Sequence, residues 1–268
     1  MDNTIKRLFF GMEIKAPWPE DFPFGRLLDE KHRHMTLAFL GNVDYLKLKE
    51  ALAVFPKPDF KVGFAAKFDQ CLFLPPHHPR VAAWHIEWLE KEAEAISLYH
   101  QILIQWLHEQ GFSPSTHAQF LPHVTLARKP FNEKIWRKKF SPLPAIVQDI
   151  HLYESVGHLQ YLPIWSYTLL PPFEELEHTA DIAYHIHGHS FDQLFHHASL
   201  ALCFHFPLFL TYLEPRQGLS SLEEVIIGLN QLVLRTDQEI GCPFKAVSFH
   251  SHLERQEGML KWEMIVDV

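Results

Sequence analysis

The chain has 268 residues, of which 47% are hydrophobic and 21% charged, and its formal net charge is −8. This balance is typical of a folded globular protein and excludes a disordered chain. The three cysteines have no close spacing, which excludes a disulfide framework and a Cys-x-x-Cys metal site and favours a reducing compartment.

No segment is predicted to enter a membrane. The N-terminal residues lack an apolar core of signal-peptide length. The most apolar stretch, residues 200–210, is interrupted by His205 and Pro207 and is too short for a span of ~20 residues. We therefore expect a cytoplasmic protein.

The first elements in chain order alternate between strands and helices. Apolar and aromatic residues predict a strand at 7–14, and the spacing of leucines predicts a partly buried helix at 44–55. A second strand is expected at 81–87. Helical spacing of apolar residues continues through 88–110, and Gly111 is the expected stop.

A boundary is predicted at Pro171-Pro172, which end an extended apolar run. Residues 1–170 carry 19 Lys and Arg against 18 Asp and Glu, whereas residues 171–268 carry 5 against 14. We therefore predict two domains, 1–170 and 171–268, with different partners. The acidic second domain would repel a polyanion, so any nucleic acid is expected to bind the first.

The second domain is predicted to contain two amphipathic helices followed by paired strands. Capping-box spacing occurs at Ser190 with Gln193 and at Ser221 with Glu224. Alternating residues at 245–254 and 259–268 predict the strands that close the chain.

The sequence His-x-Thr-Leu occurs twice, beginning at His34 and at His123. On a strand, alternate side chains share a face, so each His and its Thr lie ~7 Å apart on one side. The apolar residues between and after them anchor the other side. Thr36 and Thr125 are thus expected beside the two imidazoles.

Two imidazoles and two hydroxyls in one cleft suit the opening of a cyclic phosphodiester. One imidazole accepts a proton from water and the other donates one to the departing ribose oxygen, while the threonines bind the non-bridging oxygens. Histidine titrates near neutral pH, and each proton transfer is typically worth about 10²–10⁴-fold in rate. This chemistry requires no cofactor.

Residues 5–170 resemble the two-histidine (2H) phosphoesterase superfamily, specifically the RNA 2′,3′-cyclic phosphodiesterases of its 2′-5′ RNA ligase-like branch. The segments that carry the resemblance are RLFFGMEI, HMTLAFLG, LPHVTLAR and LYESVGHLQYLPIWSYTL. The resemblance implies a two-lobed α+β fold with antiparallel sheets lining a central cleft. It implies that His34 and His123 are the catalytic pair, with His34 as acid and His123 as base, although the pose of the substrate decides between these roles.

The resemblance also implies two substrate-binding residues. Phe39 occupies the position of an aromatic residue near the nucleobase, and Arg128 that of an arginine that contacts phosphate. From the residues alone, Phe39 could equally belong to the core and Arg128 to the surface. His32, beside the first motif, is expected to be a solvated neighbour.

Residues 173–268 resemble archease, a small protein that activates a tRNA-splicing RNA ligase. The matching segments are HTADI, the helix that follows it, KAVSFH and WEMIVDV, with apparent deletions at 207–220 and 237–245. The resemblance implies a smaller α+β domain.

In that family two aspartates bind a divalent cation near the surface used on the ligase. Here these would be Asp181 and Asp267, hard ligands suited to calcium or magnesium, and Lys245 matches a partner-facing lysine. The residues alone leave open that Asp181 caps a turn and Asp267 lies solvated at a strand edge.

Taken together, these patterns predict an RNA 2′,3′-cyclic phosphodiesterase that leaves a 2′-phosphate and needs no cofactor for catalysis. The archease-like domain would link it to an RNA ligase in tRNA splicing or repair. Two alternatives stay open: a non-catalytic regulator that binds an RNA end or nucleotide, and a phosphodiesterase for small cyclic nucleotides or 2′-5′ linkages.

Overall fold

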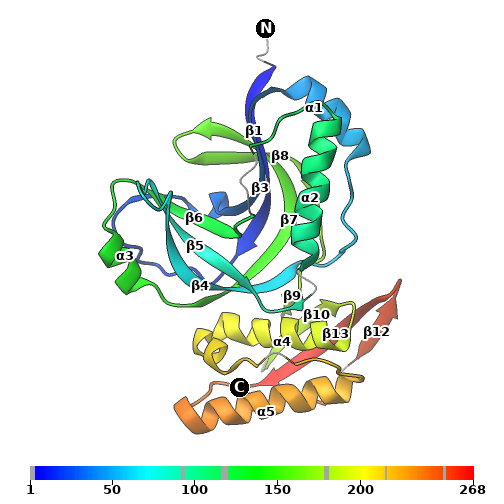
Figure 1. Ribbon diagram of the computed structural model, residues 1–268. Coiled ribbons are helices and arrows are strands. Elements are labelled where there is room, and N and C mark those ends of the chain that lie inside the picture. The colour runs from blue at the N-terminus through cyan, green and yellow to red at the C-terminus, as the bar shows by residue number, and fades with distance from the viewer. Residues whose placement is uncertain (1–3, 92–93, 116–119, 178–180, 215, 250–251) are drawn as a thin grey trace.

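The protein has two units, each built on its own antiparallel sheet, which confirms the α+β class (Figure 1). The computed structural model describes residues 4–91, 94–115, 120–177, 181–214, 216–249 and 252–268. Among these residues, no helix is both long and apolar enough to cross a membrane.

The first unit ends with the eighth strand. Its strands are β1 (Ile5–Lys15), β2 (Arg26–Leu27), β3 (His34–Asp44), β4 (Phe64–Leu74), β5 (Val81–Trp88), β6 (His123–Arg128), β7 (Leu143–Gly157) and β8 (Gln160–Tyr167). Its helices are α1 (Tyr45–Ala51), α2 (Glu94–Glu109) and α3 (Glu133–Lys139), with short 3₁₀ helices η1 (Glu30–His32) and η2 (Leu52–Val54).

The sheet of the first unit closes on itself. The strands follow the order β1-β3-β6-β5-β4-β7, and β1 also pairs with β7, so these six strands form a ring. β8 extends from β7, and β2 pairs with β6. The shared strand β1 is buried continuously from Leu8 to Met12, as a strand with two neighbours and two covered faces requires.

The helices of the first unit form largely where the sequence predicts them. Asp44 caps α1 by accepting a hydrogen bond from the Leu46 amide, and Gly111 follows α2 with a φ of +77°. The helix expected at 88–110 begins later than predicted, because β5 continues to Trp88. The Glu90 side chain, two residues further on, lies in the contact between the two units.

The second unit places two long helices beside a five-stranded sheet. Its elements are β9 (Phe173–Leu176), β10 (Ile182–Gly188), α4 (Phe191–His205), η4 (Pro207–Tyr212), α5 (Leu222–Ile240), β11 (Ala246–Val247), β12 (Leu253–Gln256) and β13 (Met259–Asp267). The hydroxyls of Ser190 and Ser221 accept from the amides of Gln193 and Glu224, which confirms both predicted helix starts. The strand expected at 245–254 is divided, since β11 and β12 pair with opposite ends of β13.

Helix α4 is not amphipathic, contrary to the prediction from sequence. Every residue from Gln193 to Cys203 is buried. The helix packs on β10 and α5 of its own unit, and it lies between α5 and the first unit (Figure 1). Its Leu200 packs with Ala65 of β4 and Ile146 of β7. A helix covered on all sides needs apolar residues around its whole circumference.

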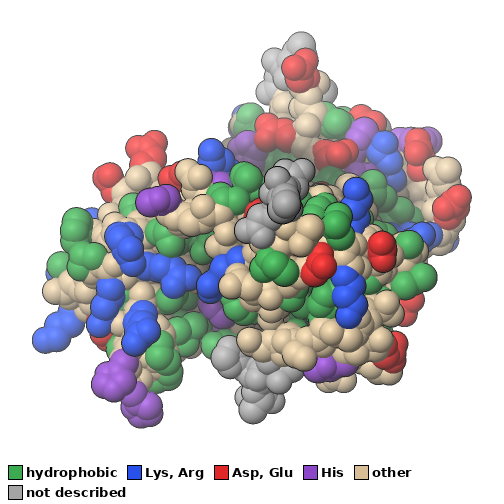
Figure 2. Space-filling view, turned by 90° about the horizontal axis from the view of Figure 1, so that it is seen from above, with side chains coloured by type: hydrophobic (Ala, Val, Ile, Leu, Met, Phe, Trp, Pro, Cys, Tyr) green, Lys and Arg blue, Asp and Glu red, His purple; other side chains and the backbone are tan. Residues whose placement is uncertain are grey.

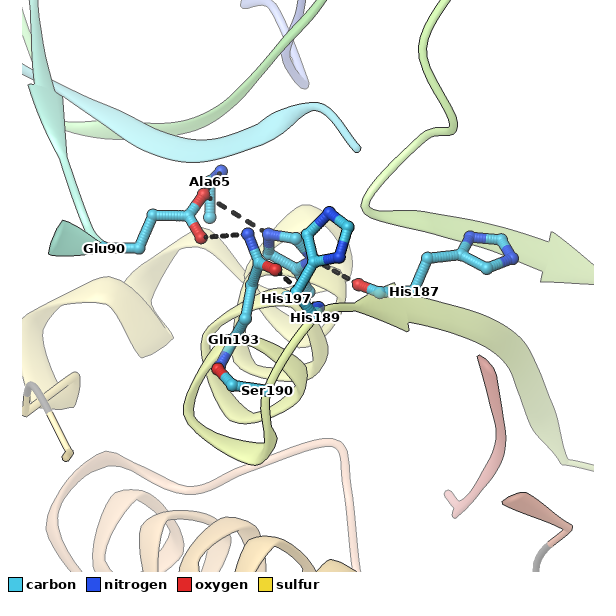
Figure 3. A network of polar contacts seen from close by, with 7 residues as sticks. All are labelled: Ala65, Glu90, His187, His189, Ser190, Gln193 and His197. Carbon is cyan, nitrogen blue, oxygen red and sulfur yellow. Dashed lines mark hydrogen bonds and ion pairs between the residues drawn. The ribbon is translucent and has the colours of Figure 1, made fainter. Parts of the chain in front are cut away.

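A buried polar network crosses the contact between the two units (Figure 3). The Glu90 carboxylate accepts hydrogen bonds from the Ala65 amide at 2.7 Å and from Gln193 Nε2 at 2.9 Å. His197 Nε2 lies 3.3 Å from Glu90, and its Nδ1 donates to the carbonyl of His187. Because both neighbours of this ring are acceptors, both of its nitrogens donate, as in an imidazolium paired with a carboxylate.

The charges of Glu90 and His197 support one another. Burial would raise the pKa of Glu90, but the charge of His197 and the hydrogen bonds from His197, Gln193 and Ala65 outweigh it and lower the pKa. The two units are therefore joined by a buried, charged contact.

Lys and Arg side chains gather on the α3 side of the first unit, as Figure 2 shows from above. This uneven distribution of positive charge would orient a charged ligand at the site described next.

Candidate active site

The two His-x-Thr motifs are paired with each other through their central residues. Met35 of β3 pairs with Val124 of β6 in antiparallel register. Continued by one residue on either side, this register sets His34 across from Thr125 and Thr36 across from His123. Met35 and Val124 are fully buried in the core, so the two histidines and two threonines occupy the opposite face together.

Each motif is followed by a β-bulge at the same position. β3 shifts register against β1 at Leu37, and β6 shifts against β5 at Leu126. Leu37 and Ala38 are both buried, and so are Leu126 and Ala127. The extra residue returns the next side chain to the face of the His and Thr.

The bulges explain how the two expected substrate-binding residues come to the face of the sheet that carries the histidines and threonines. Phe39 and Arg128 are both partly exposed and each is the fifth residue after its histidine. Phe39 is therefore not a core residue, and its ring lies 5.1 Å from the Arg7 guanidinium. Among the described residues, the buried Nε of Arg128 has no hydrogen-bond partner.

Both histidines are oriented in the same way by the backbone. His34 Nδ1 donates to the carbonyl of His32 at 2.8 Å, and His123 Nδ1 donates to the carbonyl of Leu121 at 2.8 Å. A carbonyl can only accept, so Nδ1 carries a proton in each ring. The proton that each ring can gain or lose is therefore on Nε2.

His34 lies in an aromatic box. Its ring centroid is 4.6 Å from that of Phe9, 5.1 Å from Tyr153 and 4.9 Å from Tyr161. Gly11 permits this packing, because a Cβ there would lie 2.9 Å from the Met35 carbonyl oxygen and 3.4 Å from His34 and Tyr153.

The box changes the protonation of His34. Burial is the main cause that lowers the pKa of His34 from 6.5 to about 4, and the charges of His123, His32 and Arg128 lower it further. The hydrogen bond to the His32 carbonyl acts in the opposite direction. His34 is therefore neutral at pH 7.

The expectation that His32 is solvated is wrong. Its residue is 5% exposed, and its Nδ1 lies 3.1 Å from the carbonyl oxygen of Tyr161. The 3₁₀ helix η1 turns the chain immediately before β3, which places this side chain against β8 instead of in water. His32 thus helps to fix Tyr161 beside His34.

Sequence reasoning missed the aromatic box and one further histidine. Phe9 is far in the chain from Tyr153 and Tyr161 of the β7–β8 hairpin, and only the pairing of β1 with β7 brings it to them. His85 of β5 pairs directly with His123, and its Nδ1 lies 2.7 Å from Asp69 Oδ1. No motif marks these residues.

Glu13, Asp149 and His151 form another cluster that was not predicted. Their ligand atoms lie within 4.8 Å of one another, and Asp149 is the extra residue of a bulge in β7. Burial lowers the pKa of His151, against the charges of Asp149 and Glu13. Lys15 lies 3.7 Å from Glu13 and supplies a positive charge there.

The three second-unit residues singled out from sequence lie at one end of its sheet. Ile182 pairs with Val266, and continuation of this register sets Asp181 across from Asp267. The Lys245 amide donates to the Asp267 carbonyl at 2.8 Å, and its ammonium group donates to the carbonyl of Val268. Asp181 and Lys245 thus lie immediately before β10 and β11, and Asp267 is the last residue of β13.

An open cavity of about 730 Å³ lies between the end of β5 and the second unit. It begins at His85 and Pro122, next to the cleft, and reaches the start of α4. Carboxylates in its lining are Glu87, Glu90, Glu94 and Asp192. This side of the cleft therefore disfavours an anionic ligand.

The comparisons with known proteins give partial structural likenesses. Escherichia coli LigT complexed with 3′-AMP has a TM-score of 0.45 and 22% identity, over 62% of this chain and 98% of that chain. A phosphoesterase has the same TM-score and identity over 62% and 99%. TT0787 of Thermus thermophilus has a TM-score of 0.45 and 20% identity over 61% and 97%. No family model matches the sequence, and no curated protein matches it significantly.

Proposed function

We propose that the protein is a phosphodiesterase that opens 2′,3′-cyclic phosphate ends of RNA and leaves a 2′-phosphate. The observation that carries this proposal is the pairing of the two His-x-Thr motifs at Met35 and Val124. It supplies two imidazoles with matched Nε2 atoms and two hydroxyls on one face. The nearby Arg128 adds a cation suited to a phosphate oxygen.

In this mechanism His34 acts as the general base and His123 as the general acid. His34 takes a proton from water as the water oxygen bonds to phosphorus. The bond from phosphorus to the ribose O3′ breaks, and His123 gives its Nε2 proton to that oxygen. Thr36, Thr125 and Arg128 bind the non-bridging oxygens, and Phe39 contacts the base.

The low pKa of His34 supports this assignment. At a pKa of about 4, only about one ring in a thousand is protonated at pH 7. The neutral ring is the form that accepts a proton. At pH 7 almost all molecules therefore have His34 in the protonation state that a general base requires. This assignment is the reverse of the one that the family resemblance implies for His34 and His123.

The test is hydrolysis of a short RNA with a 2′,3′-cyclic phosphate end in the presence of EDTA. Wild type should turn it over to a 2′-phosphate, and His34→Ala and His123→Ala should each lose about 10²-fold or more. His158→Asn, at an exposed position in the β7–β8 turn, is the control and should keep full activity. Binding of this RNA without turnover would instead support a regulator that recognises the end.

We further propose that the second unit is an archease-like module that contacts an RNA ligase through the end of the sheet that carries Lys245. Asp181 and Asp267 would hold calcium or magnesium there. What supports this is the opposition of the two aspartates across β10 and β13. Calcium titration of wild type and Asp267→Asn by calorimetry tests the site, and equal heats from both proteins would exclude it.

A further inference from the structure

The first unit concentrates positive charge in one short segment. Residues 128–139 contain six Lys and Arg and one acidic residue, in a chain with a net charge of −8. Most of these cations are on α3 or just before it, and Lys129, Lys134, Lys138 and Lys139 are exposed. Figure 2 shows Lys and Arg side chains gathered on this side of the molecule.

This positive segment is continuous with the candidate active site. Arg128 is the last residue of β6, the strand that carries His123 and Thr125, and Arg26 of β2 pairs with it. The exposed Arg26 side chain also donates from Nε to the Lys129 carbonyl at 2.6 Å. Cations therefore extend from the His34 end of the cleft out to α3.

An exposed aromatic ring lies beside these cations. Phe24 is 78% exposed, more than any other large hydrophobic residue among those the structure describes. Its backbone is fixed, because the Phe24 carbonyl accepts a hydrogen bond from Trp136 Nε1 at 3.2 Å and Trp136 is buried beneath α3. An exposed aromatic ring near cations is an arrangement on which an unpaired base stacks.

The opposite end of the cleft has the opposite charge. The cavity beyond His85 is lined by Glu87, Glu94 and Asp192, with Lys91 as its one lysine in the described lining. Phosphates would be repelled there and attracted towards Arg128. The charge distribution therefore gives a bound strand a direction.

We propose that Phe24, Arg26, Lys129, Lys134, Lys138 and Lys139 form a basic flank that binds single-stranded RNA leading away from the cleft. This inference rests on the proposed function, and it makes the substrate a polymer instead of a mononucleotide. The cations contact phosphates and Phe24 stacks on a base. Affinity should therefore depend on salt but little on sequence.

The test compares kcat/KM for two substrates, an RNA of about ten nucleotides and a mononucleoside 2′,3′-cyclic phosphate. A length of about ten nucleotides is within the usual span of single-strand binding sites. Wild type should have a kcat/KM at least about 10-fold higher for the RNA. The triple variant Lys134→Gln/Lys138→Gln/Lys139→Gln should lower that value about 10-fold and leave the mononucleotide within about twofold. Its slope of log affinity against log salt should fall by about 2, because each phosphate contact contributes about 0.7.

A matched control removes the same charge elsewhere. Lys49, Lys57 and Lys61 are exposed and lie outside the flank, and their triple replacement by Gln should leave both substrates unchanged. Phe24→Ala should weaken RNA binding about 5- to 10-fold without affecting the mononucleotide. Equal effects of the two triple variants, or equal kcat/KM for both substrates in wild type, would overturn the inference.

Binding of the same RNA with a 3′-phosphate end, measured by fluorescence anisotropy, separates this inference from the proposed function. If wild type hydrolyses neither substrate but the flank variant alone loses affinity for this RNA, the phosphodiesterase proposal fails and the basic flank stands. If the flank variant binds as tightly as wild type, the basic flank fails whatever the activity.

Discussion

Met35 and Val124 pair across β3 and β6, and each is the middle residue of a His-x-Thr motif. This pair relates the two halves of the candidate site, because the same order of residues follows each of its members. A threonine comes first, then a leucine at a bulge, and then a partly exposed residue. The bulges at Leu37 and Leu126 complete the relation by turning Phe39 and Arg128 to the cleft. The two halves differ in their last residue, because one carries the aromatic ring of Phe39 and the other the guanidinium group of Arg128. The proposed substrate is asymmetric in the same way, with a base and a phosphate.

The first prediction concerns the two threonine hydroxyls. Thr36→Val and Thr125→Val keep the β-branched shape but remove a donor from the cleft, so each should lower kcat/KM about 10-fold or more. Thr36→Ser and Thr125→Ser keep the hydroxyl and should retain most activity. Val and Ser variants with equal activity would show that the methyl group and not the hydroxyl matters at these positions.

The second prediction concerns the pH dependence of the reaction. If His34 is the base, its protonation in the free protein removes activity, so the decrease of kcat/KM on the acid side should lie near the His34 pKa of about 4 and not near 6.5. The measurement is kcat/KM from pH 4 to 9 at constant ionic strength. An acid limb near pH 6.5 instead of near pH 4 would contradict the low pKa of His34.

The third prediction concerns the cause of that low pKa. Phe9→Leu removes one wall of the aromatic box and admits water, so the pKa of His34 should rise by about one unit towards 6.5. NMR titration of the imidazole resonances measures this. Phe55→Leu is the control, because Phe55 is a buried ring that packs on Trp106 and Trp165 away from His34.

Local chemistry accounts for what the sequence predicts well. The strand alternation of His34 and Thr36, the caps at Ser190 and Ser221 and the turn at Gly111 each depend on a few neighbouring residues. Closure of the sheet into a ring of strands does not depend on neighbouring residues, because the pairing of β1 with β7 joins segments more than 130 residues apart in sequence.

Long-range contacts also explain the misjudged residues. Burial of His32 depends on β8, and burial of α4 on both faces depends on the first unit. Glu90 has the sequence context of an exposed helical residue, and only docking of α4 supplies His197 and Gln193 as its partners. Side chains whose environment comes from a distant element are those that periodicity within one segment cannot place.

The fourth prediction concerns the charged contact between the units. The side chains of His197 and Glu90 are fully buried, so His197→Ala leaves an uncompensated carboxylate and should cost about 3–5 kcal/mol of unfolding free energy. His205→Ala is the matched control. It breaks a His–Glu contact of the same 3.3 Å length whose side chains are 34% and 59% exposed, and it should cost at most about 1 kcal/mol.

The same contact should respond to acid and to full replacement. Because the pKa of Glu90 lies below 4.5 in the folded protein, its stabilisation is present above pH 4.5 and is lost as the pH falls through the lower folded value. Glu90→Gln should therefore reduce the acid sensitivity of urea unfolding.

The double variant Glu90→Met/His197→Leu removes both charges and should recover most of the stability lost in His197→Ala, since an apolar pair needs no counter-charge in a buried interface. Failure of this double variant to exceed His197→Ala in stability would show that the hydrogen bonds from Ala65 and Gln193, and not the charge pair, hold the two units together.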